Sequence, residues 1–447
     1  MNPVFRRELK RITGQTHHLI RGAAILLFIS YYCQILTPLR LNTDSILLLS
    51  MAESAANGKG FLDEGRPTVF PPGYPALLSL LVRFGIASST VIVGLNAVFL
   101  TIGMYAVRFL ILHSVRQENR FAEGMVTLSL LSFIFVKHYP IPLTDVPFFG
   151  TTMCCVAVTT YASTLKLGSK RFLLLALLSW ALAVLSVLVR RNGLAVVPML
   201  MWTFLSPYYV KLQSRNWRGQ FRLWFLAGAL TAAAGLGYIG MTTVSLEDFL
   251  GVLHRSDFRH LTVSIVKFRL MELGELALNI PESKLLASGS VILPGIGLAF
   301  VVLAFGGLRE LIRTPERGIA PVDVFFVFFV AILFLWPYRD ARFWMTAVPL
   351  LLAYGAHFVL RWIQSRIALA FLLMYFLLFT GLGLAAIVYS TRITFAREAF
   401  PDRYGDGSLR STYCVALGGC GSDFDPGTVN SKALHLLRVY RATSREN

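Results

Sequence analysis

A series of apolar segments, separated by short basic stretches, constrains this chain more than any other feature. A helix needs about 20 mostly apolar residues to cross the hydrocarbon core of a bilayer, and a helix satisfies its own backbone polar groups within one segment. Segments that reach or approach this length begin near Ala23, Ala87, Phe121, Val146, Phe172, Leu194, Trp224, Ser288, Pro321, Phe343 and Ile367. The mean hydropathy of +0.62 and the charged fraction of 15% also indicate a lipid solvent. We therefore predict an all-α, polytopic membrane protein with about 11 spanning helices.

The distribution of the net charge of +18 predicts the orientation in the membrane. A nucleic-acid partner would require the basic residues to gather on one folded face or tail. Here they lie in short runs between apolar segments, so we expect no nucleic acid. One set of alternate loops holds 19 Lys and Arg residues, whereas the short loops of the other set hold five. Because cytoplasmic loops carry the excess, we predict a cytoplasmic N-terminus and an external C-terminus, with the plasma membrane as the location.

We predict a membrane domain, residues 1–390, followed by a short tail, residues 391–447. Because the number of spans is odd, the tail lies on the external side. The basic stretch before the first span lacks the pattern of a cleavable signal peptide, so that span is expected to stay as an anchor. Two long loops, residues 40–86 and 244–287, fall on the external side. The first loop contains two segments with helical apolar spacing that are too short to cross a bilayer. We expect interfacial helices there, joined by a strip rich in Gly and Pro. The second loop shows a similar amphipathic pattern.

The cysteines divide between the spans and the tail. Three lie in apolar segments, where buried thiols are the ordinary state: Cys33, Cys154 and Cys155. Cys414 and Cys420 lie in the predicted external tail, where they could form a disulfide or remain unpaired. The sequence leaves that choice open.

Ionisable residues gather at the predicted outer face of the membrane. They are Asp44, Asp145, the pair Arg190 and Arg191, and the group Arg339, Asp340 and Arg342. An ionisable group close to the hydrocarbon costs free energy, so such groups tend to be paired or functional. The alternative is that these residues mark loop ends and extend to water.

The segment from residue 41 to residue 85 carries an ordered set of motifs. Asp44 directly follows the first span, a turn of small residues covers Ala52 to Gly60, and a Pro-Pro element covers Pro71 to Pro75. In this the chain resembles the GT-C glycosyltransferases of the branch that includes protein O-mannosyltransferases and aminoarabinose transferases of lipid A. The stretches LTDVPFF, with Asp145, and RFWMTAVPLL, ending near Pro349, extend the resemblance.

One departure from that family concerns the first loop. Many relatives place Lys or Arg directly before the Pro pair, whereas this chain has Phe70 there, with Lys59 and Arg66 as the nearest cations. The position directly before the Pro pair therefore offers no cation to a donor phosphate. The first-loop motif residues of this chain are Lys59, Arg66, Pro71, Pro72 and Tyr74.

The resemblance implies transfer of a sugar from a polyprenyl-phosphate carrier to a hydroxyl of a lipid, glycan or protein acceptor, with inversion. The departing phosphate needs no proton donor, so one carboxylate suffices as general base, and we assign that role to Asp44. Arg339 and Arg342 are the first choice for the donor phosphate, with Arg190 and Arg191 second. Asp145 could orient the acceptor, hold an arginine, or bind a divalent cation with Asp44. His138 and His254 could join the site or be ordinary loop histidines.

Two other classes of function remain as alternatives. A transporter or flippase would place ionisable residues near the middle of the bilayer on broken helices, whereas here they lie at one face. A non-catalytic membrane scaffold would not depend on any single carboxylate.

Overall fold

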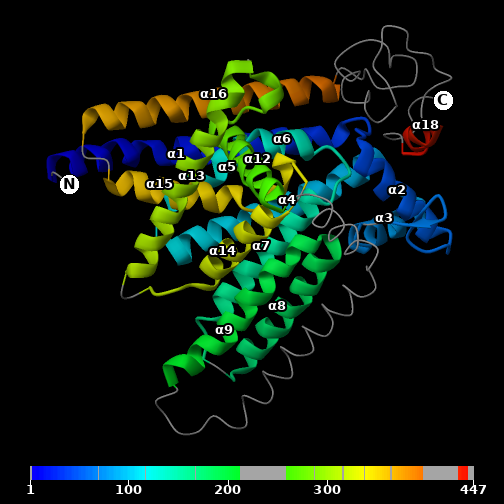
Figure 1. The fold of residues 1–447 in the computed structure, drawn as a ribbon, viewed down its shortest axis with the longest axis horizontal. Helices are drawn as coiled ribbons and strands as arrows, with labels where there is room; N and C mark the ends of the chain where they lie inside the picture. Colours follow the sequence, from blue (N-terminus) through cyan, green and yellow to red (C-terminus); the bar gives the residue numbers. More distant parts are fainter. Residues whose placement is uncertain are drawn as a thin grey trace.

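The computed structural model of the chain is built almost entirely from α-helices (Figure 1). It describes residues 3–68, 70–115, 117–166, 168–211, 258–285, 287–314, 317–336, 338–362, 365–395 and 431–440. The helices of the first half are α1 (Pro3–Cys33), α2 (Thr43–Ala56), α3 (Gly73–Arg83), α4 (Ser89–Leu110), α5 (Asn119–Leu131), α6 (Phe133–His138), α7 (Asp145–Ala162), α8 (Lys170–Val189) and α9 (Val196–Lys211). The later helices are α12 (Phe258–Leu278), α13 (Ala287–Arg313), α14 (Pro321–Leu335), α15 (Val348–Trp362), α16 (Arg366–Phe395) and α18 (Ser431–Val439).

The structure supports an integral membrane protein. Among the described residues, five helical stretches are long and apolar enough to cross a bilayer: His18–Leu36, Ser89–Val115, Lys170–Val189, Val291–Arg313 and Ile367–Arg392. Two shorter apolar helices are α14 and α15. Each predicted span coincides with one helix, except the third, which is divided into two, and the span near Trp224, which lies outside the described residues. The orientation of the bundle in the membrane stays a prediction.

The third predicted span, which begins near Phe121, is broken into α5 and α6. Ser132 between them is extended, so the helical hydrogen-bond ladder is interrupted there. The side chain of Asn279, which follows α12, fills this gap. It accepts a hydrogen bond from the Phe133 backbone N–H (2.7 Å) and donates to the carbonyls of Leu131 and Phe379 (3.0 Å each). One buried amide thereby satisfies backbone groups that the break would leave unpaired.

The described part of the second long loop forms α12, which packs along α13. The two helices cross so closely that an added Cβ on Gly297 would lie 1.9 Å from the Leu270 carbonyl oxygen, and one on Gly274 would lie 2.3 Å from that of Leu293. Small residues at a crossing allow this approach. Because α12 also buries Arg269 and Glu272, it is more deeply packed than the predicted amphipathic loop pattern suggested.

The first long loop contains both helices that the sequence predicts, α2 and α3. Between them lies a two-stranded antiparallel hairpin, β1 (Leu62–Asp63) and β2 (Arg66–Pro67). Its turn residues Glu64 and Gly65 have positive φ angles of 49° and 80°, as a tight hairpin turn requires. The short helix α18 of the tail packs against α2, so the tail helix and the first loop lie at the same end of the molecule (Figure 1).

Candidate active site

Asp44 lies in the first turn of α2, where the helix begins directly after the first span. Asn42 caps this helix: its side chain accepts a hydrogen bond from the Ser45 backbone N–H (2.8 Å), and the Ser45 hydroxyl accepts one from the Asn42 N–H (2.7 Å). This capping box fixes the start of the helix. A carboxylate in the first turn is also favoured by the helix dipole. The local sequence therefore defines where the Asp44 side chain is presented.

Asp145 is the first residue of α7, and its side chain is only 1% exposed. The loop before it is held by Asn96 of α4, whose amide donates to the carbonyls of Tyr139 (2.8 Å) and Ile141 (3.2 Å). Arg190, at the end of α8, forms an ion pair with Asp145. Burial raises the pKa of Asp145, but the positive charges of Arg190 and Arg342 outweigh it and hold the pKa below its usual value.

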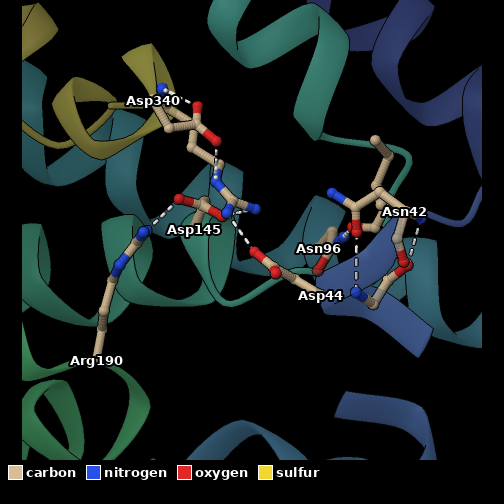
Figure 2. Close-up of polar contacts among 9 residues, drawn as sticks. Asn42, Asp44, Asn96, Asp145, Arg190 and Asp340 are labelled. Carbon is tan, nitrogen blue, oxygen red and sulfur yellow. Dashed lines mark hydrogen bonds and ion pairs between the residues drawn. The ribbon is translucent and has the colours of Figure 1, made fainter. Parts of the chain in front are cut away.

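Arg342 lies at the centre of the cluster, in the 3-10 turn η5 (Ala341–Trp344). It forms an ion pair with Asp44, a second with Asp340 (Nε to Oδ2, 2.7 Å), and a longer contact with Asp145 (Nη1 to Oδ2, 4.0 Å). Asp340 also accepts a hydrogen bond from the Arg342 backbone N–H (3.0 Å) and so caps the turn. Figure 2 shows Asp44, Asp145 and Asp340 around this one guanidinium group, with Arg190 on the far side of Asp145. We call these five residues the arginine–aspartate cluster.

The ring of Phe343 supports the cations of the cluster. Arg190 lies 4.7 Å from the centre of this ring, Arg342 5.6 Å and Arg269 5.8 Å. Guanidinium groups at such distances are attracted to the face of an aromatic ring. Phe343 therefore helps to hold several arginines close together despite their mutual repulsion.

His138, at the end of α6, is buried near the cluster. Its Nδ1 has no hydrogen-bond partner among the described residues. His254 lies outside the described residues.

A second polar cluster lies beside the first and was not predicted as part of the site. Arg269 and Glu272 of α12 form a buried ion pair, and Glu272 accepts a hydrogen bond from the Trp344 indole N–H (2.8 Å). Arg269 also donates to the Trp336 carbonyl (2.9 Å). These contacts attach α12 to the segment that carries Arg342. The spacing of three residues between Arg269 and Glu272, which places opposite charges on one face of a helix, was the available sequence signal.

Arg339 belongs to this second group rather than to the arginine–aspartate cluster. It forms an ion pair with Glu282 and lies 5.3 Å from the centre of the Phe268 ring. Arg191 begins the 3-10 turn η3 (Arg191–Ala195) and is half-buried. The sequence-based prediction thus grouped residues that the structure divides: Asp44, Asp145, Arg190 and Arg342 come together, whereas Arg339 takes another partner.

The first-loop motif residues have mainly local roles. Lys59 and Arg66 are exposed, and neither takes part in the ion pairs of the cluster. Pro71 is buried and Pro72 precedes α3 as its N-cap. Tyr74 is fully buried, and its hydroxyl has no hydrogen-bond partner among the described residues.

The structure describes three of the five cysteines. Cys33, Cys154 and Cys155 are free thiols, and Cys155 is buried. Cys414 and Cys420 lie outside the described residues, so the question of a disulfide in the tail stays open.

The residues of the cluster do not fit a divalent cation. Among the described residues, no group of three or more His, Cys, Asp and Glu side chains is arranged to hold a metal ion. Asp44 and Asp145, which the sequence offered as ligands, each face a guanidinium group instead.

Comparison with known proteins places the fold. No protein-family model and no curated protein matches the sequence. The solved oligosaccharyltransferase of Archaeoglobus fulgidus tethered to an acceptor peptide has a TM-score of 0.50 at 13% identity, over 95% of this chain and 63% of its own. The archaeal oligosaccharyltransferase AglB with an inhibitory peptide and dolichol-phosphate gives 0.49 at 14% identity, over 84% and 56%. ArnT from Cupriavidus metallidurans bound to undecaprenyl phosphate gives 0.45 at 14% identity, over 86% and 75%.

The match with a TM-score of 0.50 shows a shared fold at 13% sequence identity. The chain spans 56% to 63% of the length of the two oligosaccharyltransferases, so it corresponds to only part of them. The protein is an all-α, polytopic integral membrane protein with a GT-C-like fold, as the sequence predicts.

Proposed function

We propose that the protein is a membrane glycosyltransferase that moves a sugar from a polyprenyl-phosphate carrier to an acceptor hydroxyl at the external face, with inversion. The observation that carries this proposal is the arginine–aspartate cluster. Four separate segments, from α2, α7, α8 and the turn η5, each contribute to it. The likeness in fold to an oligosaccharyltransferase agrees with this class of reaction.

Asp44 is the general base of this proposal. Its side chain is 28% exposed, against 1% for Asp145, so it is the more accessible of the two carboxylates. Its ion pair with Arg342 uses Oδ2, which leaves Oδ1 to accept the proton of the attacking hydroxyl. The phosphate departs as an anion, and no second proton has to be transferred. General-base catalysis of this kind contributes about 10² to 10⁴ in rate.

Arg190 and Arg342 are the cations that meet the departing phosphate. Their planar guanidinium groups present several donors in a fixed fork, which suits phosphate oxygens. Asp145 contacts both of them and so sets their spacing. This is one of the roles that the sequence left open for Asp145. Arg339 keeps a secondary role, because Glu282 already neutralises it.

The Asp44→Asn variant tests the proposal. This change keeps the shape of the side chain and removes the base, so turnover should fall by about 10² or more, while donor binding and folded yield stay near those of the parent. Glu64→Gln is the matched control, because Glu64 lies in the same loop and its side chain is 75% exposed. Turnover that persists in Asp44→Asn would assign Asp44 a structural role and remove the general base from the proposal.

A further inference from the structure

We infer that the chemistry of this site proceeds without a divalent cation, because Arg342 occupies the position between Asp44, Asp145 and Asp340 that such a cation would need. This inference rests on the proposed function. The contacts of Arg342 that support it, however, can be tested without measuring turnover.

The carboxylates are oriented toward the guanidinium group rather than toward an open coordination site. Arg342 pairs with Asp44 through one terminal nitrogen and with Asp340 through Nε (2.7 Å), and its other terminal nitrogen lies 4.0 Å from Asp145. Magnesium and manganese would require several oxygen ligands directed at one point, with room for bound water. The guanidinium group fills that point.

The neighbours of the carboxylates also oppose a metal ion. Asp145 is almost fully buried, and Arg190 holds its second side. His138, which lies near the cluster, is not arranged with the carboxylates as a ligand group among the described residues. A divalent ion placed among them would lie beside two fixed positive charges, those of Arg190 and Arg342, and would be repelled by both.

The charge of the cluster is close to balanced without a metal. Three carboxylates face two guanidinium groups. The Phe343 ring, 5.6 Å from Arg342, holds the guanidinium in place. Arg342 can therefore supply the fixed positive charge that stabilises a departing phosphate, a task that a metal ion performs in other phosphoryl-leaving reactions.

Binding of Mn²⁺ to the purified full-length protein, measured by electron paramagnetic resonance, tests the inference directly. The parent should show no stoichiometric Mn²⁺ site, and its turnover should not change when EDTA is added. The Arg342→Ala variant loses the built-in cation, so it should bind Mn²⁺ at least about tenfold more tightly than the parent. Arg361→Ala is the matched control, since Arg361 is 60% exposed and pairs with Glu310 (3.5 Å) away from the cluster.

Two results would overturn the inference. One is stoichiometric Mn²⁺ binding to the parent that weakens in Asp44→Asn and Asp145→Asn. The other is an Arg342→Ala variant that binds Mn²⁺ no more tightly than the parent does. If Arg342→Ala cannot be purified in a folded form, binding by the parent, with and without Asp145→Asn, decides alone. Since Mn²⁺ binding is read without substrate, it separates this inference from a failure of the proposed transfer activity.

Discussion

At the scale of single residues, the site is defined by which charges neutralise each other. Asp145 and Arg342 each have more than one partner of opposite charge, whereas Asp44 keeps one oxygen outside its ion pair. Glu275 of α12, three residues after Glu272 of the second cluster, is also influenced by the charges of its neighbours. Burial raises the pKa of Glu275 to about 7, against the opposing effects of the Glu282 backbone N–H, which donates to it at 3.0 Å, and of Arg339.

This pKa predicts how stability depends on pH. Between the ordinary value of 4.5 and about 7, the folded state binds more protons at Glu275 than the unfolded state does. The contribution of Glu275 to the free energy of unfolding is therefore fully present below about pH 4.5 and is lost as the pH rises through about 7. We expect the thermal midpoint in detergent to fall over this range, and Glu275→Gln to make the fall shallower. A variant with the same pH profile as the parent would exclude Glu275 as the cause.

At the scale of elements, the structure depends on contacts that connect distant helices. The break between α5 and α6 is satisfied by Asn279, which lies 146 residues further along the chain than Phe133. Asn279 also adopts a positive φ of 58°, which Asn tolerates better than most residues.

We expect Asn279→Ala to destabilise the fold by about 3 kcal/mol or more, because it leaves several buried backbone groups without partners. Asn119→Ala serves as the control, since Asn119 is an exposed residue that accepts one hydrogen bond from Arg108 (3.2 Å). Thermal unfolding in detergent compares the two. Equal midpoints for Asn279→Ala and the parent would show that water or a shifted helix replaces the amide.

The same examples show what the sequence could predict. Apolar length identified the helices at the predicted spans within the described residues, and short amphipathic spacing identified α2 and α3. The interruption at Ser132 was not predicted, because the residue that compensates for it lies far away in the sequence. Likewise, Arg339 and Arg342 are three residues apart and looked equivalent, but Arg339, before the turn η5, pairs with Glu282, whereas Arg342, within it, pairs with Asp44. Partner choice of this kind is set by packing and not by local pattern.

At the scale of the whole molecule, the tail helix α18 fastens the first loop. Lys432 forms an ion pair with Asp63 of the hairpin, His435 lies 3.3 Å from Glu53 of α2, and the Tyr440 carbonyl accepts a hydrogen bond from the Ser89 N–H (3.1 Å). The loop that presents Asp44 is thus held by the tail helix, which lies far from it in the sequence.

We expect Leu436→Asp to release this loop, because Leu436 is fully buried between α18 and its neighbours. Trypsin should then cleave after Lys59, which is exposed in the same loop, several times faster than in the parent. Val439→Asp is the matched control, since Val439 of the same helix is 50% exposed. Cleavage at the parental rate in Leu436→Asp would mean that the tail does not restrain the loop.

The most direct test of the central claim is transfer by the purified protein in detergent, where no second compartment exists. The account predicts that a labelled sugar passes from a polyprenyl-phosphate donor to an acceptor hydroxyl, with inverted configuration at the anomeric carbon. It also predicts that Asp44→Asn lowers the rate of this transfer by about 10² or more while it still binds the donor. The opposite result, in which no polyprenyl-phosphate sugar reacts in detergent while the lipid crosses the membrane of proteoliposomes, would contradict the account and identify a transporter.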